Sequence, residues 1–452
     1  MKRLFLLVFL FSSFHGFALV KFDISNTKND TLFIGYYFGS FKNMMVLDTV
    51  ILKNGVGEYK NDTLKSCLYF IYNDKNKYDL LLSGSEKNLK VSYQSPDFIS
   101  TSKIEGSPIA SSFVSYMKKL NAEKAILKID STLSKSTGKA VAEYLKKTIA
   151  ANKENILGKF LNFYTPVQVP EGTQEFRFKY FKQHFFDNAN IFDEELLHTP
   201  LVEEKLNEYY SYLVGTPAEI CQDIDSLLLK SQSNKSLFRF VLVNSFQHYL
   251  KSNLVVAENI WVHIAQKWYI PQASWSDFAY MERLKHEVKM RLPNLIGEKA
   301  PDFAATVLST NDFLAAQTDS VKRKDVYQGK ESDFSASVGN NYTLLIFFEA
   351  DCSHCREVMP SFYQVYQKYV LKGLKGVLLN NNNTPEGKIE WCDYINNNKM
   401  YDFVNCWSPY SNLYKDLYNI ISTPTVYLLN NGVIELKNID SKTLDEYLKN
   451  KI

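Results

Sequence analysis

The chain has 452 residues, which is more than one hydrophobic core normally serves, and its 45% hydrophobic and 22% charged residues are typical of globular proteins. Its 52 basic and 49 acidic residues give a formal net charge of +3, so no excess of positive charge marks a nucleic-acid-binding protein. The six cysteines are too few for a disulfide-stabilised scaffold of this length. We therefore expect three globular domains and no nucleic-acid partner.

The first residues predict export. Lys2 and Arg3 precede the apolar run LFLLVFLF, and Gly16 and Ala18 then supply the small residues of a cleavage site. An uncleaved membrane anchor is the alternative, but this run is shorter than the ~20 residues that span a bilayer. We predict a signal peptide over residues 1–18, no transmembrane segment after it, and a location in the periplasm or cell envelope.

Residues 19–106 have the pattern of an antiparallel β-domain. Short runs rich in β-branched and aromatic residues are separated by turn residues, and Asn54-Gly55 favours a hairpin. The expected strands are VKFDIS, TLFIGYYFG, MVLDTVIL, CLYFIYN, YDLLLSG and NLKVSY.

Residues 107–291 show helical periodicity instead. Stretches such as SSFVSYMKKLNAEKAILK and PLVEEKLNEYYSYLV are separated by Gly, Pro and Asn, which predicts an all-helical domain. Trp261, His263 and Trp268 lie at near-helical spacing in this domain, and this spacing favours helix packing over a ligand site.

Residues 292–452 alternate between strand and helix patterns. TLLIFF, KGVLLN and DFVNCW read as strands, each followed by a helical stretch, and PTVYLLN and VIELKNI flank Asn431-Gly432 as a hairpin before a last helix. This order is that of a thioredoxin fold. The whole chain is therefore predicted to be multidomain, with α+β and α/β parts.

The stretch EADCSHCREVMP, Glu349 to Pro360, places two cysteines at the start of the helix that follows TLLIFF. Cys352 and Cys355 are three residues apart, so their sulfurs share a helix face and can form a disulfide. The positive end of the helix dipole stabilises a thiolate. Cys352 is therefore the expected nucleophile, and Cys355, one turn deeper, is the expected resolving thiol.

Other uses of a cysteine pair fit less well. Attachment of a c-type haem needs His after the second cysteine, and this chain has Arg356 there. A structural zinc site needs two further ligands, and Cys392 and Cys406 form no second C-x-x-C. We expect no metal and no cofactor, while a second disulfide between Cys392 and Cys406 remains an alternative use of those two thiols.

The region from Asn294 to Ile452 resembles the TlpA/ResA-like branch of the thioredoxin superfamily. GEKAPDF resembles the lead-in of that family, DCSHC its active site and STPTVYLL its cis-proline segment. The resemblance implies that Thr423-Pro424 is a cis peptide that faces the disulfide and that the backbone beside it pairs with substrate polypeptide. The two preceding regions resemble the β-domain and the helical domain that are often found ahead of envelope thioredoxins.

Several positions depart from the family pattern. Asp351 stands where tryptophan is usual, and its charge should oppose thiolate formation. Ile346 replaces the buried acid of thioredoxins, which leaves Glu349 as a candidate for proton transfer. Asn380–Asn383 fill a loop where some relatives hold a carboxylate. A protonated His354 should stabilise the thiolate, although an exposed histidine without a redox role is the alternative.

These observations predict an exported thiol-disulfide oxidoreductase that exchanges disulfides with envelope proteins as a reductant. Its partners are protein thiols and disulfides and an unidentified envelope electron donor. Two alternatives stay open. A peroxiredoxin-like peroxidase is disfavoured because FFEADC lacks the proline and threonine of that active site. A binding protein with a vestigial dithiol is the other alternative.

Overall fold

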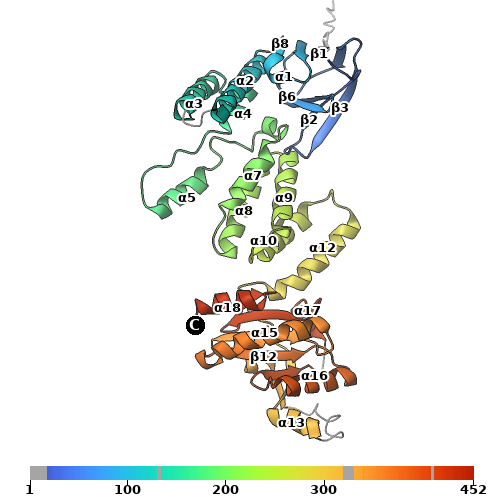
Figure 1. Cartoon of the computed structure of the whole chain (residues 1–452), viewed down its shortest axis with the longest axis vertical. Helices are drawn as coiled ribbons and strands as arrows, with labels where there is room; N and C mark the ends of the chain where they lie inside the picture. The colour runs from blue at the N-terminus through green and yellow to red at the C-terminus, as the bar shows by residue number, and fades with distance from the viewer. Residues whose placement is uncertain (1–17, 130–133, 319–329, 340, 409–411) are drawn as a thin grey trace, which may run out of the picture. The chain divides into compact units, whose positions relative to one another are not determined.

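The computed structural model describes residues 18–129, 134–318, 330–339, 341–408 and 412–452 (Figure 1). The predicted signal peptide lies outside these residues except for Ala18, which begins the first strand. The chain forms two compact units, one of Met1–Gly215 with Gln222–Ser245 and the other of Thr216–Cys221 with Phe246–Ile452. The boundaries expected at residues 107 and 292 remain predictions. Within the described ranges, no helix has the length and apolar character needed to cross a membrane.

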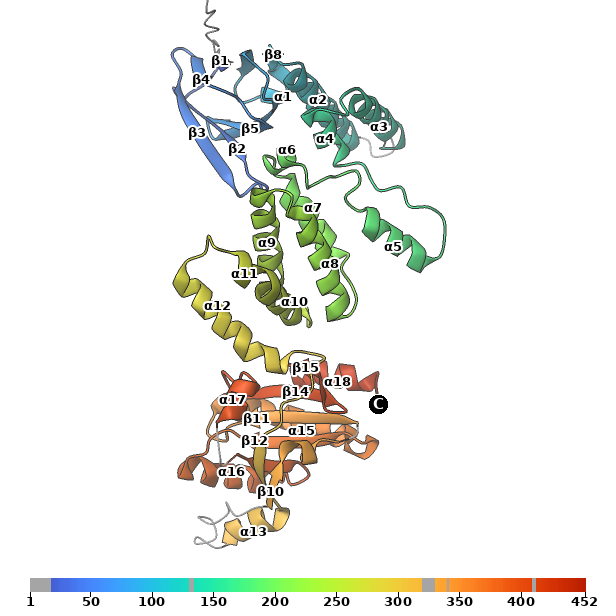
Figure 2. The same ribbon diagram turned by 180° about the vertical axis from the view of Figure 1, so that it is seen from behind.

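The first unit begins with two four-stranded sheets, in the orders β4-β1-β7-β8 and β3-β2-β5-β6 (Figure 2). Their strands are β1 (Ala18–Ser25), β2 (Thr31–Tyr37), β3 (Met44–Ile51), β4 (Val56–Asn61), β5 (Ser66–Asn73), β6 (Asn76–Ser83), β7 (Asn88–Gln94) and β8 (Lys103–Glu105). Both sheets contribute to one apolar core, in which Phe22, Ile34 and Leu80 are among the fully buried side chains.

The sheets differ in two respects from the purely antiparallel arrangement that we expected. β1 and β7 run parallel, because the intervening chain passes through the second sheet before it returns. Asn54 and Gly55 do form a turn, with φ angles of 55° and 79°. The strands on either side of this turn belong to different sheets, and an isolated bridge between Lys53 and Val56 closes the turn.

Helices follow the sheets. They are α1 (Phe98–Thr101), α2 (Pro108–Ile129), α3 (Ser134–Ala151), α4 (Ile156–Asn162), α5 (Gln174–His184), α6 (Glu194–Leu197), α7 (Leu201–Ser211), α8 (Pro217–Ser231), α9 (Lys235–Leu250), α10 (Ala257–Ile264), η2 (Ala265–Tyr269), α11 (Ile270–Gln272), α12 (Phe278–Arg291) and η3 (Leu292–Asn294). Trp261 and Trp268 are buried, and the ring of Trp261 packs edge-on against Phe246. These contacts are those of helix packing.

The C-terminal region is built on a seven-stranded sheet in the order β10-β9-β13-β12-β11-β14-β15. Its elements are β9 (Ala304–Leu308), α13 (Thr310–Thr318), β10 (Lys330–Asp333), η4 (Phe334–Ser337), β11 (Tyr342–Phe348), α15 (Ser353–Tyr369), η5 (Val370–Lys372), β12 (Lys375–Asn380), α16 (Pro385–Asn398), β13 (Val404–Trp407), α17 (Leu413–Leu417), β14 (Thr425–Asn430), β15 (Val433–Lys437) and α18 (Ser441–Lys449).

The pairing in this sheet is that of a thioredoxin fold. β11 lies between β12, to which it is parallel, and β14, to which it is antiparallel, and every residue of β11 is buried. Leu344, Ile346 and Phe348 pack in one core with side chains from α15, α16 and α18. Leu345 and Phe347 pack in a second core with Tyr414. The predicted fold class is therefore confirmed, with β-sheets first, helices next and a thioredoxin-like sheet last.

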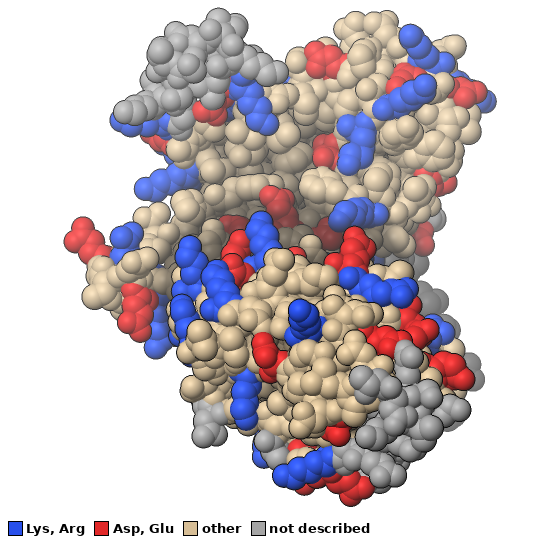
Figure 3. All heavy atoms as spheres, turned by 60° about the horizontal axis from the view of Figure 1, so that its bottom comes forward, with Lys and Arg blue, Asp and Glu red and all other residues tan. Residues whose placement is uncertain are grey.

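The surface carries charges of both signs. On the face drawn in Figure 3, Lys and Arg side chains are interspersed with Asp and Glu side chains. This distribution agrees with the small formal net charge of +3.

Candidate active site

The two cysteines lie at the start of α15. Cys352 is the N-cap residue of this helix, with extended backbone angles, and its N–H donates to the carbonyl oxygen of Glu349 at 3.2 Å. Because the N-cap residue precedes the first helical turn, its side chain faces the free N–H groups of that turn. Cys352 is partly exposed and Cys355 is fully buried. The two thiols thus differ in access to solvent.

The surroundings shift the pKa values of the two thiols in opposite directions. The pKa of Cys352 is lowered, first by the backbone N–H of Cys355 and then by the Cys355 thiol, Thr423 and the backbone of His354, while partial burial opposes this shift. Burial raises the pKa of Cys355 to about 11. A thiolate forms more readily on Cys352, which is the thiol that an incoming disulfide can reach.

The loop before β14 lies against Cys352. The Thr423-Pro424 peptide bond is cis, as the family resemblance implies. The Cys352 thiol donates a hydrogen bond to the carbonyl oxygen of Thr423, with Sγ and oxygen 3.7 Å apart. Residues far apart in the sequence are therefore brought together at the dithiol.

A chain of hydrogen bonds runs through Glu349 beside this loop. One carboxylate oxygen accepts from Nδ2 of Asn381 at 2.7 Å, and the other accepts from the hydroxyl of Thr423 at 3.5 Å. The buried hydroxyl of Tyr414 donates in turn to Oδ1 of Asn381 at 2.9 Å. Glu349 and Asn381 meet because parallel strands β11 and β12 end at the same edge of the sheet, where the Asn381 N–H donates to Phe348.

Sequence reasoning named Glu349 but missed Asn381 and Tyr414 as its partners. In the sequence, the loop Asn380–Asn383 differs from some relatives in having no carboxylate. Its place after a strand parallel to β11 was a signal that could have identified Asn381. No comparable signal in the sequence marks Tyr414, which lies in a different helix, α17.

The side chains of Asp351 and His354, which lie next to the cysteines, are exposed. Oδ2 of Asp351 accepts from Nδ2 of Asn382 at 3.0 Å. The side chain of His354 is 66% exposed, and its Nδ1 lies 3.9 Å from a carboxylate oxygen of Glu357. The backbone of His354, rather than its exposed ring, acts on the Cys352 sulfur.

A cavity of about 450 Å³ lies between α15 and the cis-proline loop. His354 and Phe362 of α15 line one side, and Pro424 and the segment Asn438–Ser441 line the other. The cavity is therefore lined by the first turns of the helix that carries the cysteines and by the cis-proline loop, while neither cysteine lines it.

Two family models match parts of the chain. Residues 339–433 match the model described as "Thioredoxin-like", which covers the dithiol and the cis-proline loop. Residues 134–294 match a domain of unknown function, DUF5106, which covers most of the helices of the middle of the chain. No curated protein matches the chain.

Solved structures from bacteria are similar over different lengths. A thioredoxin-like protein from Bacteroides caccae is 17% identical, with a TM-score of 0.43, over 63% of this chain and 98% of its own. A domain of a possible thiol-disulfide isomerase from Cytophaga hutchinsonii is 25% identical, with a TM-score of 0.27, over 35% and 95%. A thiol:disulfide interchange protein from a Bacteroides species is 20% identical, with a TM-score of 0.27, over 35% and 91%.

Proposed function

We propose, from the premise that the C-terminal region of this chain is thioredoxin-like, that the protein is a thiol-disulfide oxidoreductase. It reduces disulfides of other proteins with the dithiol of Cys352 and Cys355. The observation that carries this proposal is the placement of a partly exposed thiol at the helix start beside the cis Thr423-Pro424 peptide, with a fully buried thiol one turn later. The pKa is lowered at the exposed thiol and raised at the buried one, in agreement with this placement. This asymmetry suits one thiol to attack and the other to resolve.

The reaction has two exchanges. The Cys352 thiolate attacks one sulfur of a substrate disulfide, which forms a mixed disulfide and releases the other substrate sulfur as a thiolate. Cys355 then loses its proton and attacks the Cys352 sulfur, which closes the Cys352–Cys355 disulfide and releases the second substrate thiolate. Two electrons pass from the dithiol to the substrate. A dithiol electron donor of the envelope returns the site to its reduced form.

The neighbouring residues act on this chemistry without bonding to the substrate sulfurs. Thr423 and Pro424 contact the backbone of the bound polypeptide, which lies in the adjoining cavity of about 450 Å³. Glu349 and Asp351 tune the redox potential of the dithiol through their charges, and His354 tunes it through its backbone N–H at the helix start. No metal or cofactor takes part in the exchange.

The proposal also includes the location of the protein and the roles of its other domains. The protein is exported by its first 18 residues and works in the periplasm or cell envelope. The β-domain over 19–106 and the helical domain over 107–291 bring partner proteins to the dithiol of the domain over 292–452. The 380–383 loop contains only asparagines and cannot accept the proton of Cys355. Glu349 therefore accepts this proton.

Trapping of the mixed disulfide tests the proposal. A Cys355→Ala variant, expressed with its signal, should accumulate covalent adducts with envelope proteins that reductant releases, because the resolving thiol is missing. A Cys352→Ala variant is the matched control and should form few adducts. If adducts form through Cys355 instead, the two roles are reversed.

Two activity measurements separate the alternatives. Reduction of insulin disulfides by the wild-type protein supports the oxidoreductase, and its absence supports a binding protein with a vestigial dithiol. Consumption of hydrogen peroxide at a rate above that of insulin reduction would favour a thiol peroxidase.

A further inference from the structure

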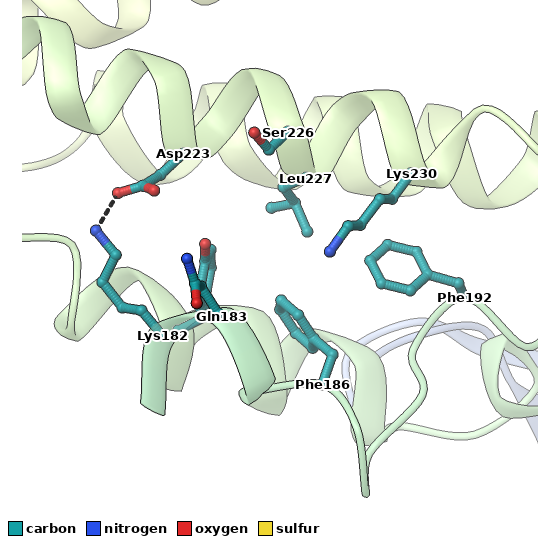
Figure 4. Close-up of a pocket in the computed structure, with 9 residues that line it drawn as sticks. Lys182, Gln183, Phe186, Phe192, Asp223, Ser226, Leu227 and Lys230 are labelled. Carbon is teal, nitrogen blue, oxygen red and sulfur yellow. Dashed lines mark hydrogen bonds and ion pairs between the residues drawn. The ribbon is translucent and has the colours of Figure 1, made fainter. Parts of the chain in front are cut away.

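A second cavity, of about 410 Å³, lies in the first unit among residues that the thiol chemistry does not use (Figure 4). Residues from α5 and α8 face each other across it, and aromatic side chains from the segment after α5 and from α7 complete its wall. A volume of this size is in the range of small-molecule sites, which is about 300–1,000 Å³.

One face of α8 supplies the charged ends of the cavity. Asp223, Leu227 and Lys230 are spaced by four and three residues, so they lie along one side of the helix. Asp223 is already neutralised, because Nζ of Lys182 from α5 lies 2.5 Å from its carboxylate. Asp223 is therefore paired with Lys182, and Lys230 at the other end of the cavity remains available to pair with a ligand.

Lys230 extends its amino group toward the rings of Phe186 and Phe192 (Figure 4). Within the part of the chain that the structure describes, no carboxylate forms an ion pair with this lysine. Two lysines and one aspartate among the lining residues leave one positive charge in excess. An anion is the complement of that charge.

The wall between the charged ends is aromatic. The ring of Phe186 packs against Phe192 at 5.5 Å and against Tyr209 at 4.8 Å between centroids. The side chain of Tyr209 is only 7% exposed, and its hydroxyl makes no hydrogen bond among the described residues. This oxygen is not one of the fully buried polar atoms without a partner, so it stays accessible from the cavity. Burial, followed by the nearby Asp223, raises the pKa of this phenol, so the hydroxyl remains a donor that a ligand oxygen can satisfy.

We propose that this cavity binds a small monoanion with a flat apolar ring. The carboxylate or sulfonate of the ligand pairs with Lys230, its ring packs on Phe186 and Phe192, and a polar atom accepts from Tyr209. The site belongs to the helical part of the chain and is independent of the proposed redox function.

The α5 helix gives the proposal a second readout. None of the residues of α5 is buried, so few apolar contacts hold this wall of the cavity. A ligand bound between α5 and α8 adds contacts to both. Hydrogen exchange of the α5 amides should therefore slow when the ligand is present.

Titration of the full chain with 2-naphthoate, followed by calorimetry, tests the proposal. We expect saturable binding at one site, at least tenfold weaker binding of the cationic analogue 2-naphthylmethylamine, and slower exchange over residues 174–184 with naphthoate. Lys230→Gln should weaken naphthoate binding by about three- to tenfold. Lys235→Gln, which removes an exposed lysine from α9 outside the cavity, is the control and should bind as the wild type does.

Three outcomes would overturn the proposal. They are non-saturable naphthoate binding, equal binding of the anion and the cation, and equal weakening by the Lys230 and Lys235 substitutions. Thermal melts of both variants, matched to the wild type, exclude a folding defect as the cause of lost binding.

Discussion

The parallel pair β1–β7 in the first unit and the parallel pair β11–β12 in the second end in similar surroundings. Beyond β1 and β7, the carboxylate of Asp74, from the turn between β5 and β6, accepts from the N–H groups of Lys28 and Asn29 and from the hydroxyl of Ser95. Ser95 belongs to the cis Ser95-Pro96 peptide. Beyond β11 and β12, Glu349 lies near the cis Thr423-Pro424 peptide. An acid beside a cis-proline at a strand end therefore does not by itself indicate chemistry.

Asp74 and Glu349 differ in the groups that surround them. Backbone N–H groups hold Asp74, so its role is to fix a turn. Glu349 accepts only from side chains among the described residues, and the next helix begins with a thiol three residues later. The helix start and the two cysteines distinguish the candidate active site from its structural counterpart.

The largest expected effect is the difference in reactivity between the two thiols. At pH 7 a thiol with a pKa of about 11 is ionised in roughly one molecule in 10⁴, whereas a pKa below 9 gives more than one in 10². Because a thiolate of higher pKa is also the stronger nucleophile, part of this difference is offset. We expect Cys352, measured in Cys355→Ala, to react with iodoacetamide at least about tenfold faster than Cys355, measured in Cys352→Ala. Comparable alkylation rates would contradict the assignment of Cys352 as the attacking thiol and Cys355 as the resolving thiol.

The structural counterpart can be tested by Asp74→Asn. The loss of charge-assisted hydrogen bonds should lower the free energy of unfolding by about 1–3 kcal/mol and leave insulin reduction unchanged. The pKa of Asp74 is lowered: burial opposes this shift, and its hydrogen bonds, first with Lys28, outweigh that opposition. Its stabilisation is therefore present above the unfolded pKa and is lost as pH falls through the folded one. The variant should show a shallower loss of stability on acidification.

Much of this comparison could be predicted from sequence and some of it could not. TLLIFF read as a buried strand because all its residues are apolar or β-branched, and the helix that follows it places the cysteines without further information. β4 was missed because VGEYKN has only two apolar residues and a glycine. The parallel pairing of β1 with β7 was missed because the residues of a strand do not record the direction of its neighbour.

The same reasoning applies to the site. Cys352, Cys355 and Pro424 belong to short motifs, so their positions were evident in the sequence. The contact between Tyr414 and Asn381 joins residues 33 positions apart and depends on how α17 packs on the sheet. Such contacts follow from tertiary packing, which local patterns do not contain.

A smaller effect is expected from Glu349→Gln, the counterpart of the Asp74 substitution. A carboxylate near the dithiol opposes a thiolate, so its removal should lower the pKa of Cys352 by a few tenths of a unit to about one unit. The pH dependence of iodoacetamide alkylation measures this shift. Glu446→Gln, in the exposed part of α18, is the control and should leave the pKa unchanged. A rise in the pKa of Cys352 in Glu349→Gln would contradict this role for the carboxylate.

The smallest expected effects separate the imidazole of His354 from its backbone. His354→Pro removes both the ring and the N–H group, and proline is tolerated in the first turn of a helix. Because the backbone of His354 helps to lower the pKa of Cys352, this variant should have a less stable thiolate and a disulfide that is harder to reduce. We expect a potential about 10–30 mV more negative in glutathione buffers.

His354→Ala removes the ring but keeps the N–H group, so it is the matched control for the proline variant. The ring is 66% exposed and lies near Glu357, and a charge so exposed to solvent has little influence on the sulfur. The alanine variant should therefore shift the potential by less than half as much as the proline variant. Equal shifts of the potential in the two variants would assign the effect to the imidazole. No shift in either variant would mean that the rest of the helix start, above all the N–H of Cys355, sets the stability of the thiolate.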